Sequence, residues 1–235
     1  MKNVLISFFC FGLFFSVCFA DDKVELKDEK DKVSYSVGYQ IGGDFKGKGV
    51  ELNPALLVKG IQDSIAGTVP IMTPEEMNKT TNELKQKIMA ANIEQRKKTA
   101  EKNLSEGKKF MEDNAKKEGV KTLPSGLQYK VIKEGSGAMP KATDTITAHY
   151  RGTTIDGAEF DNSYSREEPA TFQLNQVIKG WIEALQLMKE GAKWQIVIPP
   201  HLAYGEQELG RIQANSTLIF DVELISVKTA DKTTK

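Results

Sequence analysis

The spacing of apolar and polar residues predicts helices in the first half of the chain and strands in the last third. The longest predicted element is a helix over residues 74–118. It begins with a capping box at 73–76 that has proline at the first helical position, and Gly107 interrupts it without ending it. Residues 94–109 are charged almost all round, which is typical of a helix that crosses solvent between domains. A disordered charged linker is the alternative, which the strong helix formers disfavour.

The segment before this helix, residues 24–70, is small and also suggests helices. Asn53 is suited to cap a helix that starts at Pro54. The apolar face of that helix would consist of Leu56, Leu57, Ile61 and Ile65. The run from 33 to 45 is ambiguous, because its apolar residues alternate as in a strand but also recur at every fourth position as on a helix. Periodicity leaves both interpretations open.

From Leu127 onward the pattern is mainly that of strands. Alternation predicts strands that start near residues 127, 146, 193 and 217, the last of which reaches Val227. One short helix fits between about Gln176 and Leu187. Glycine and proline in residues 119–126 mark the boundary between the long helix and this C-terminal domain.

The first twenty residues differ from all others. Lys2 precedes an almost wholly apolar run over 4–19, and Ala20 supplies a small residue before two aspartates. This pattern predicts a secretory signal peptide, because the apolar run is short for a spanning helix; an N-terminal membrane anchor is the alternative. Both cysteines, Cys10 and Cys18, lie in this segment. A mature chain without them would have neither a disulfide nor a thiolate, which suits an oxidising compartment.

Charge and residue types exclude several classes of function. The 32 Lys and Arg residues balance the 32 Asp and Glu residues, so nucleic acid is a poor candidate partner. His149 and His201 are far apart and have no ligand partners at metal spacing. Neither a glycine-rich phosphate loop nor a Ser-His-Asp pattern is present. We therefore expect no metal ion and no cofactor.

Five short motifs in the last third point to a reaction. In chain order they are Ala-His-Tyr-Arg-Gly at 148–152, Glu-Phe-Asp at 159–161, Val-Ile-Lys-Gly-Trp at 177–181, Leu-Ala-Tyr-Gly at 202–205 and Leu-Ile-Phe-Asp-Val-Glu-Leu at 218–224. With these motifs in order and correctly spaced, the chain from about Gly126 to Val227 resembles an FKBP-type peptidyl-prolyl cis-trans isomerase. The complete layout is similar to the Mip (macrophage infectivity potentiator) subgroup, which consists of dimeric, exported isomerases of Gram-negative bacteria.

The resemblance implies an α+β fold in which a C-terminal antiparallel sheet wraps one short helix. A long connecting helix and a small all-α dimerisation module would precede it. The implied divisions are a signal peptide at 1–20, a helical dimerisation domain at 21–72, the connecting helix at 73–118 and the isomerase domain at 119–235. The implied location is the periplasm or the outer membrane and cell surface. The implied partners are proline-containing polypeptides, a second copy of the chain through residues 24–70 and macrolide inhibitors.

The resemblance also implies roles for the residues of a proline pocket. Trp181 would form its floor, and Tyr204 would hydrogen-bond a substrate carbonyl. Asp161 would lie beside the twisting carbonyl, oriented by Tyr150 and Arg166. The implied catalytic residues are thus Asp161, Tyr204 and Tyr150, and the implied substrate-binding residues are Phe160, Arg166, Val177, Ile178, Trp181, Ile212 and Phe220.

Such a pocket suits the reaction, because the twisted imide is less polar than the planar form and a dry aromatic site favours it without moving a proton. The backbone N–H of Ile178 would hold the peptide. Two departures from the family's prototype bear on substrate preference and macrolide affinity: Ala170 replaces a pocket-wall phenylalanine, and the loop 205–210 is short and lacks histidine. Taken singly, each aromatic residue is better explained by core packing; only the ensemble favours the pocket.

Two other functions stay open on sequence alone. A dimeric holdase chaperone could cradle unfolded chains with little dependence on turnover, and the charged spacer and separate N-terminal module favour chaperone activity as an addition to catalysis. An interaction protein that keeps only the fold is disfavoured, because every implied catalytic position carries a suitable side chain.

Overall fold

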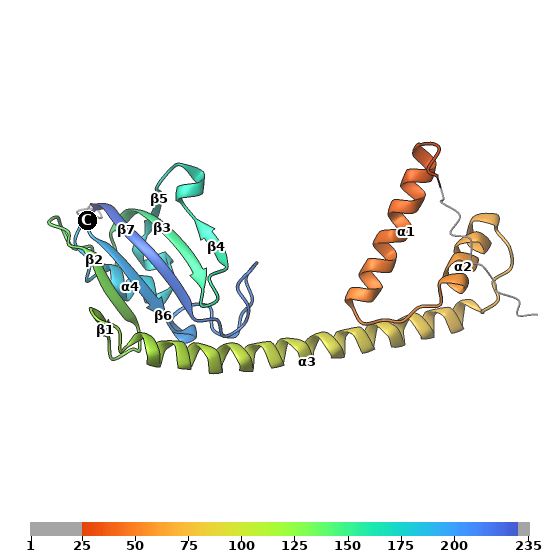
Figure 1. Ribbon diagram of the computed structural model, residues 1–235, viewed down its shortest axis with the longest axis horizontal. Coiled ribbons are helices and arrows are strands. Elements are labelled where there is room, and N and C mark those ends of the chain that lie inside the picture. Colours follow the sequence, from red (N-terminus) through yellow and green to blue (C-terminus); the bar gives the residue numbers. More distant parts are fainter. Residues whose placement is uncertain (1–24, 230–235) are drawn as a thin grey trace, which may run out of the picture. The chain divides into compact units, whose positions relative to one another are not determined.

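The computed structural model describes residues 25–229 (Figure 1). The predicted signal peptide and both cysteines lie outside the described residues. Contacts divide the chain into two compact units, Met1–Met77 and Asn78–Lys235. The long helix α3, Pro74–Asn114, begins in the first unit and continues into the second. Within residues 25–229, no helix combines the length and the apolar character needed to cross a bilayer.

The first unit contains the helix α1, Glu29–Gly47, which includes the run whose periodicity was ambiguous. The side chain of Asp28 accepts the amide N–H of Asp31 at 2.9 Å and so caps the helix. Tyr35 and Tyr39 lie one turn apart and stack with their ring centroids 6.2 Å from each other. The helical stripe, rather than the strand-like alternation, is the pattern that the backbone follows.

The second helix of this unit, α2, spans Pro54–Ala66 and begins where the sequence predicts. Its cap residue Asn53 accepts the amide N–H groups of Ala55 and Leu56 at 3.0 and 3.2 Å. The helix ends at Gly67, whose φ of 66° is a left-handed conformation that glycine adopts without strain.

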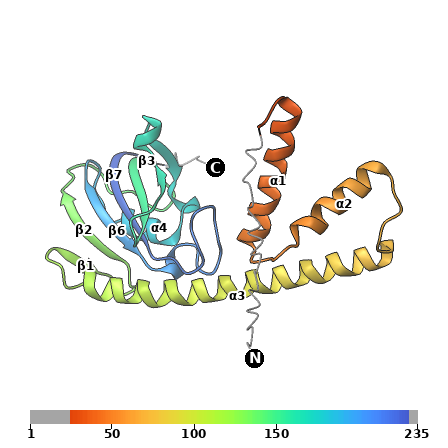
Figure 2. The same cartoon turned by 45° about the vertical axis from the view of Figure 1, so that its right-hand side comes forward.

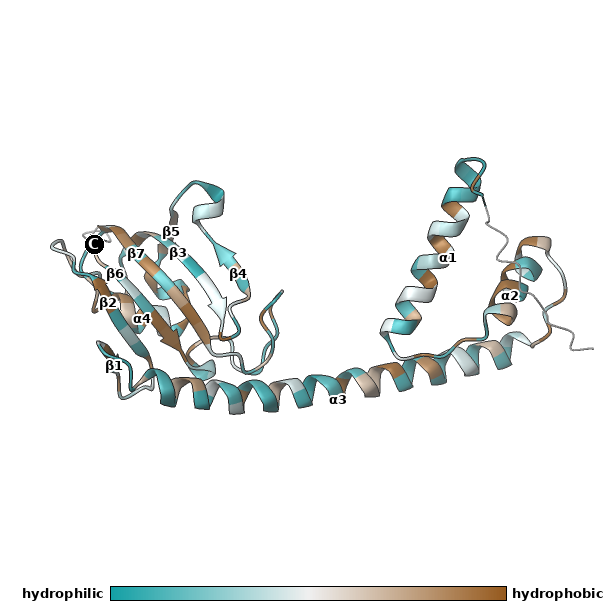
Figure 3. Ribbon diagram, in the orientation of Figure 1, coloured by the Kyte–Doolittle hydropathy of each residue, from teal (hydrophilic) through white to brown (hydrophobic). Residues whose placement is uncertain are grey.

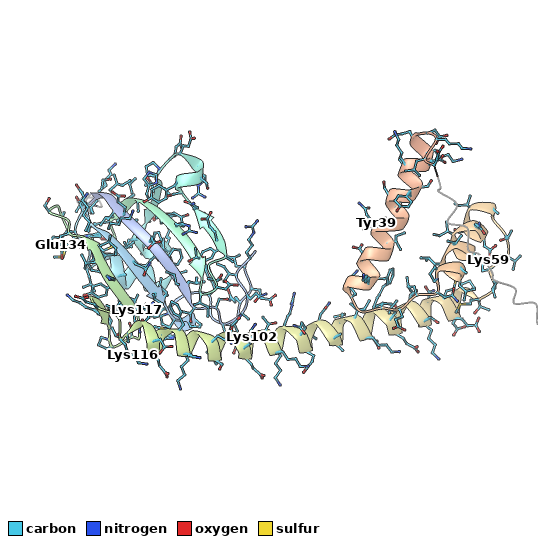
Figure 4. The ribbon with its side chains drawn as sticks, in the orientation of Figure 1. Tyr39, Lys59, Lys102, Lys116, Lys117 and Glu134 are labelled. Atoms are coloured by element: carbon cyan, nitrogen blue, oxygen red, sulfur yellow. The ribbon has the colours of Figure 1, made fainter. Side chains whose placement is uncertain are left out.

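Neither α1 nor α2 has a buried residue in the single chain that the structure describes. Hydrophobic residues recur along both helices (Figure 3). Tyr39, labelled in Figure 4, is 73% exposed and Leu56 is 64% exposed. The exposed members of this apolar surface are Val33, Tyr35, Val37, Tyr39, Leu56, Val58, Ile61 and Ile65. A surface with so much exposed apolar area is typical of a protein–protein interface.

Helix α3 begins at the predicted capping box. The backbone N–H of Thr73 donates to Glu76 Oε2 at 2.8 Å, and the N–H of Glu76 donates to Thr73 Oγ1 at 3.2 Å. The helix ends at Asn114, four residues before the predicted end, and Gln128 of the sheet hydrogen-bonds to its last turn. Gln128 Nε2 donates to the carbonyl of Met111 at 2.8 Å, and its Oε1 accepts from Asn114 Nδ2 at 2.9 Å.

The last turns of α3 pack against the sheet-containing unit. Gly107 is buried, and a Cβ atom at this position would lie 2.3 Å from Thr217 Oγ1 and 3.2 Å from Thr217 Cβ. Glycine therefore lets the helix approach the start of the last strand closely. Lys102 of α3 is exposed, as are Lys116 and Lys117, which follow the helix (Figure 4).

The second unit is built on one antiparallel sheet whose strands follow the order β1-β2-β6-β7-β3-β4, with β5 also paired to β3. The strands are β1 Val120–Thr122, β2 Gln128–Lys133, β3 Thr145–Thr154, β4 Glu159–Asn162, β5 Ala170–Gln173, β6 Lys193–Ile198 and β7 Leu218–Lys228. The four predicted strands are present as β2, β3, β6 and β7. The short strands β1, β4 and β5 were not predicted from the sequence.

One short helix, α4 (Lys179–Leu185), packs against the sheet (Figure 2). It is shorter than the predicted 176–187, because residues 174–176 form a separate 3₁₀ turn. The core between helix and sheet is fully buried and consists largely of Leu127, Ile146, Leu174, Leu185, Met188, Ile196, Ile198, Leu218, Val222 and Leu224. The predicted α+β fold, with a sheet wrapped on one short helix, is therefore confirmed.

Candidate active site

Three aromatic rings from three strands surround Trp181, which lies in the first turn of α4. The Trp181 ring meets those of Tyr150, Phe172 and Phe220 at centroid distances of 5.1, 5.7 and 5.4 Å. All three pairs are close to perpendicular, a geometry that is favourable beyond the area it buries. Trp181 is only 4% exposed. Its ring is therefore fixed on three sides.

Phe160 of β4 extends this aromatic wall, with its ring 5.5 Å from that of Phe220. The ring passes close to Gly152 of β3, where a Cβ atom would lie 2.6 Å from Phe160 and 2.9 Å from Phe220. Gly180 has a similar part in α4, because a Cβ atom there would lie 2.5 Å from Ile198. Two glycines of the sequence motifs thus make room for the aromatic wall and for the seating of α4 on the sheet.

A carboxylate lies among these rings. Asp161 Oδ2 accepts a hydrogen bond from the Tyr150 hydroxyl at 2.5 Å, and Oδ1 accepts one from Arg166 Nη1 at 2.8 Å. Arg166 Nη2 also donates to the Tyr150 hydroxyl oxygen at 3.1 Å. The three side chains form a closed triangle, so both carboxylate oxygens are held in place.

The triangle keeps Asp161 ionised and Tyr150 protonated. Burial of the Asp161 carboxyl alone would raise its pKa, but the hydrogen bonds from Arg166 and Tyr150 outweigh burial, and the pKa lies below its ordinary value. Burial, followed by the hydrogen bond to Asp161, raises the pKa of Tyr150. At neutral pH the site therefore presents a fixed negative charge rather than a group poised to exchange a proton.

Tyr204 reaches the same space from the loop between β6 and β7. Burial, followed by the negative charge of Asp161, raises the pKa of its hydroxyl, which stays protonated at neutral pH. Within residues 25–229 that hydroxyl has no hydrogen-bond partner. It is therefore available as a donor to a bound molecule.

These side chains enclose a pocket of about 670 Å³, a size typical of small-ligand sites. The pocket is lined by Tyr150, Phe160, Asp161, Phe172, Gln176, Val177, Ile178, Trp181, Tyr204, Leu209, Gly210, Arg211, Ile212 and Phe220. It brings together every site residue predicted from the sequence except Arg166, which contacts Asp161 and Tyr150 instead. Ala170 does not line it and pairs with Ala148 in the sheet.

Some lining residues were not predicted as site residues: Phe172, Gln176, Leu209, Gly210 and Arg211. Phe172 carried a signal, because it is an aromatic residue among the motifs of the last third. Leu209, Gly210 and Arg211 at the tip of the loop carried none, although Ile212 beside them was predicted. There Leu209 and Ile212 exchange two backbone hydrogen bonds of 2.9 Å, and only this tight hairpin turns their side chains to the pocket.

The two histidines have structural partners. His149 Nδ1 is hydrogen-bonded to Ser163 Oγ at 3.0 Å, and its ring stacks on Tyr164 at 4.5 Å. His201 Nε2 is hydrogen-bonded to the carbonyl of Ser125 at 3.0 Å. Among residues 25–229 no three His, Cys, Asp or Glu side chains are grouped so that they could hold a metal ion.

Two family models match the chain. The model for FKBP-type peptidyl-prolyl cis-trans isomerase matches residues 137–225. The model for the domain amino terminal to FKBP-type peptidyl-prolyl isomerase matches residues 30–131. Between them the matches include both helices of the first unit and the elements that build the pocket.

Individual proteins are similar over nearly the whole chain. "Outer membrane protein MIP" of Legionella longbeachae is 44% identical over 232 residues, which cover 98% of this chain and 100% of that protein. "Peptidyl-prolyl cis-trans isomerase Mip" of Coxiella burnetii is 42% identical over 229 residues, with coverages of 97% and 99%. The crystal structure of FkpA from Escherichia coli matches with a TM-score of 0.72 at 39% identity and covers 88% of this chain and 100% of that one.

Proposed function

The chain belongs to the FKBP-type peptidyl-prolyl cis-trans isomerases, and we propose that it catalyses rotation about X-Pro bonds in the pocket above Trp181. It is an isomerase of the Mip-like type. One observation carries the assignment of the pocket: an ionised, doubly hydrogen-bonded carboxylate, Asp161, is enclosed by aromatic rings. The side chain of Asp161 is 40% exposed, and placing a charge in such a partly desolvated, aromatic site is costly and needs a reason.

The enclosure favours the twisted imide over the planar one. Rotation about an X-Pro bond is slow because resonance stabilises the planar amide, with a barrier of roughly 18–20 kcal/mol. Resonance puts negative charge on the carbonyl oxygen, and twisting removes part of it. The rings of Trp181, Phe160 and Phe220 would hold the proline ring and exclude water. Asp161 would repel the planar carbonyl more strongly than the twisted one, so the site binds the transition state more tightly.

Two donors would fix the peptide while the bond rotates. The Tyr204 hydroxyl would donate to one substrate carbonyl and the backbone N–H of Ile178 to another. The hydroxyl and the amide N–H both support the proposal, because neither group donates to an acceptor among residues 25–229. Val177 and Ile212 would complete the apolar walls, and Arg166 would hold Asp161 from outside the pocket.

Tyr204→Phe is expected to lower kcat/KM for a proline-containing tetrapeptide by about tenfold or less, since one hydrogen bond contributes roughly 0.5–1.5 kcal/mol. The melting temperature should not change, because the hydroxyl has no protein partner to lose. The measurement is the isomerisation rate of the tetrapeptide. Tyr164→Phe is the matched control, because its hydroxyl lies 3.5 Å from Glu223 and outside the pocket. Equal activities of the two variants would contradict the role of Tyr204.

We further propose that the substrates are exported, proline-containing polypeptides and that macrolides compete for the same pocket. The signal peptide predicted at 1–20, which lies outside the described residues, supports export to the periplasm or the outer surface. The name of the Legionella longbeachae relative refers to an outer membrane, which agrees with that destination. The divisions 21–72, 73–118 and 119–235 would then be the dimerisation domain, the connecting helix and the isomerase domain.

The N-terminal unit is proposed to join two chains. Its helices bury no residue by themselves, and so short a segment cannot form a stable core alone. Pairing with a second copy would cover the exposed apolar surface of α1 and α2. The match of residues 30–131 to the amino-terminal family model supports this use.

The double substitution Tyr35→Glu/Tyr39→Glu is expected to convert a dimeric protein into a monomer. Charges placed on an apolar interface would have to be desolvated without partners, which is strongly unfavourable. Sedimentation at micromolar concentration measures the mass of each species. Lys30→Glu is the control for added negative charge on the same helix and should stay dimeric. A monomeric unmodified protein, with its leader removed, would contradict the proposal.

A second function, chaperone activity with little dependence on turnover, is favoured by the separate N-terminal unit and the exposed, charged stretch of α3, because two isomerase domains joined in one dimer could hold the same unfolded chain. The two functions separate in a pocket variant that stays folded: it should lose isomerisation of the tetrapeptide but still suppress aggregation of an unfolded protein.

A further inference from the structure

The loop that follows Tyr204 touches both the pocket and α3. At its base the amide N–H of Asn215 donates to the carbonyl of Gly205 at 2.7 Å. At its tip the hairpin formed by Leu209 and Ile212 lines the pocket. Gly205, Gly210 and Asn215 all have positive φ, so the path of the backbone is closely defined. A displacement at the base would therefore be carried to the pocket wall.

Two side chains of α3 hold this loop. Asn103 Nδ2 donates to the carbonyl of Ala214 at 2.9 Å, next to the base of the loop. Two turns earlier on the helix, Arg96 Nε lies 3.3 Å from Glu208 Oε2, next to the tip. Neither Asn103 nor Arg96 is among the residues that line the pocket.

We infer that Asn103 and Arg96 are positioning residues of the isomerase site, through which α3 sets the placement of Leu209 and Ile212 against the proline. The inference rests on the assignment of this pocket as the site of isomerisation. It makes the docked part of α3 a component of the active site rather than a spacer. Because coupling of this kind is reciprocal, a peptide bound in the pocket would also stabilise the contact between loop and helix.

The two contacts differ in strength. The side chain of Arg96 is 70% exposed, and ion pairs in solvent contribute little. The carbonyl of Ala214 belongs to a residue that is only 7% exposed. Without the Asn103 amide it would lose its partner in a place that water reaches poorly. Asn103 should therefore have the larger effect.

The helix cannot easily move away to relieve such a change. One turn after Asn103, Gly107 fits closely against Thr217, and Asn114 is fixed to Gln128 at the helix end. These contacts keep α3 in place when the amide at position 103 is removed. The loop, rather than the helix, would then shift.

Asn103→Ala in the full chain is expected to weaken binding of the tetrapeptide Ala-Leu-Pro-Phe by about three- to tenfold, the range that one lost hydrogen bond gives. The isomerisation rate of the bound peptide should stay within about twofold, because Asp161 and Trp181 are untouched. NMR exchange measures both quantities. Asn92→Ala is the matched control: it makes the same change of helix propensity on an exposed part of α3. Charge reversal tests the second contact, since Arg96→Glu and Glu208→Arg should each weaken binding slightly and together restore it.

A merely structural role of Asn103 would lower the melting temperature and leave the peptide affinity unchanged. Equal affinities of Asn103→Ala and Asn92→Ala would therefore overturn the inference, provided that Trp181→Leu loses binding. If Trp181→Leu also bound the peptide normally, the assignment of the pocket would fail together with the inference.

Discussion

Trp181→Ala is expected to reduce isomerisation of proline peptides to the background rate and to lower the free energy of unfolding by about 3–5 kcal/mol. The ring contacts Tyr150, Phe172 and Phe220 edge to face, and its removal leaves a void beneath the bound proline. The twisted imide would then meet space or water where it needs an apolar floor. Peptide binding and thermal unfolding, measured on the same sample, separate the two effects.

The chain contains its own control for this substitution. Trp194 is 5% exposed and stacks on Tyr129 at 4.3 Å, but it does not line the pocket. The Nε1 atoms of both tryptophans are buried without a hydrogen-bond partner among residues 25–229, so neither substitution removes a hydrogen bond. Trp194→Ala should therefore lower the free energy of unfolding by a similar amount. The folded fraction of this variant should keep its isomerase activity. Loss of activity in both variants to the same degree would show that stability, rather than the floor of the pocket, determines the result.

Asp161→Ala is expected to lower turnover by about ten- to a hundredfold, the range for losing an interaction with a charged group. Binding of the planar substrate should change far less than turnover, because the carboxylate acts on the difference between planar and twisted forms. Glu159→Ala is the matched control: this carboxylate lies on the same strand and pairs with Arg151 at 2.7 Å outside the pocket. A variant at Asp161 with normal turnover would contradict the mechanism.

The same carboxylate sets the pH dependence. The folded-state pKa of Asp161 is below its ordinary value, so its contribution to stability is present at neutral pH and is lost only as the pH falls through that lowered pKa. Tyr204 and Tyr150 have raised pKa values and stay protonated. Activity should therefore be nearly constant between about pH 6 and 8, well above the reference carboxylate pKa. A bell-shaped profile within that range would indicate general acid–base catalysis instead.

Sequence patterns predicted the elements that have a strong local signal. The cap at Asn53 and the box at 73–76 fixed two helix starts, because their side chains bond to the first amides whatever surrounds them. Between 33 and 45 two periodicities coincide, and only the family resemblance favoured the helix. The short strands β4 and β5 share the two halves of one edge of β3, a pairing that depends on distant residues and leaves little local pattern.

The residues of the site also divide into those with a local sequence signal and those without one. Its aromatic floor and its carboxylate lie in motifs that can be read along the chain. The face of α3 that packs against the sheet-containing unit cannot be read along the chain, because its residues Asn103, Gly107 and Asn114 are polar or small and form no apolar stripe. Their partners are 14 to 111 positions away in the chain, and glycine at 107 looked like a weak point of the helix rather than its closest contact.

The exposed stretch of α3 has a consequence for local unfolding and proteolysis of the protein. From residue 78 to 98 every side chain is exposed except Leu84 and Ile88, which are half buried. The helix there depends on local interactions, such as the ion pair between Lys98 Nζ and Glu94 Oε1 at 3.4 Å. Each such interaction stabilises the helix by only about a few tenths of a kcal/mol. This stretch therefore unravels more readily than the sheet and offers its many lysines to proteases first. Cleavage there would release a fragment that contains the pocket and still carries the docked turns of α3, so a cleaved chain would lose the proposed dimerisation unit before it loses isomerase activity.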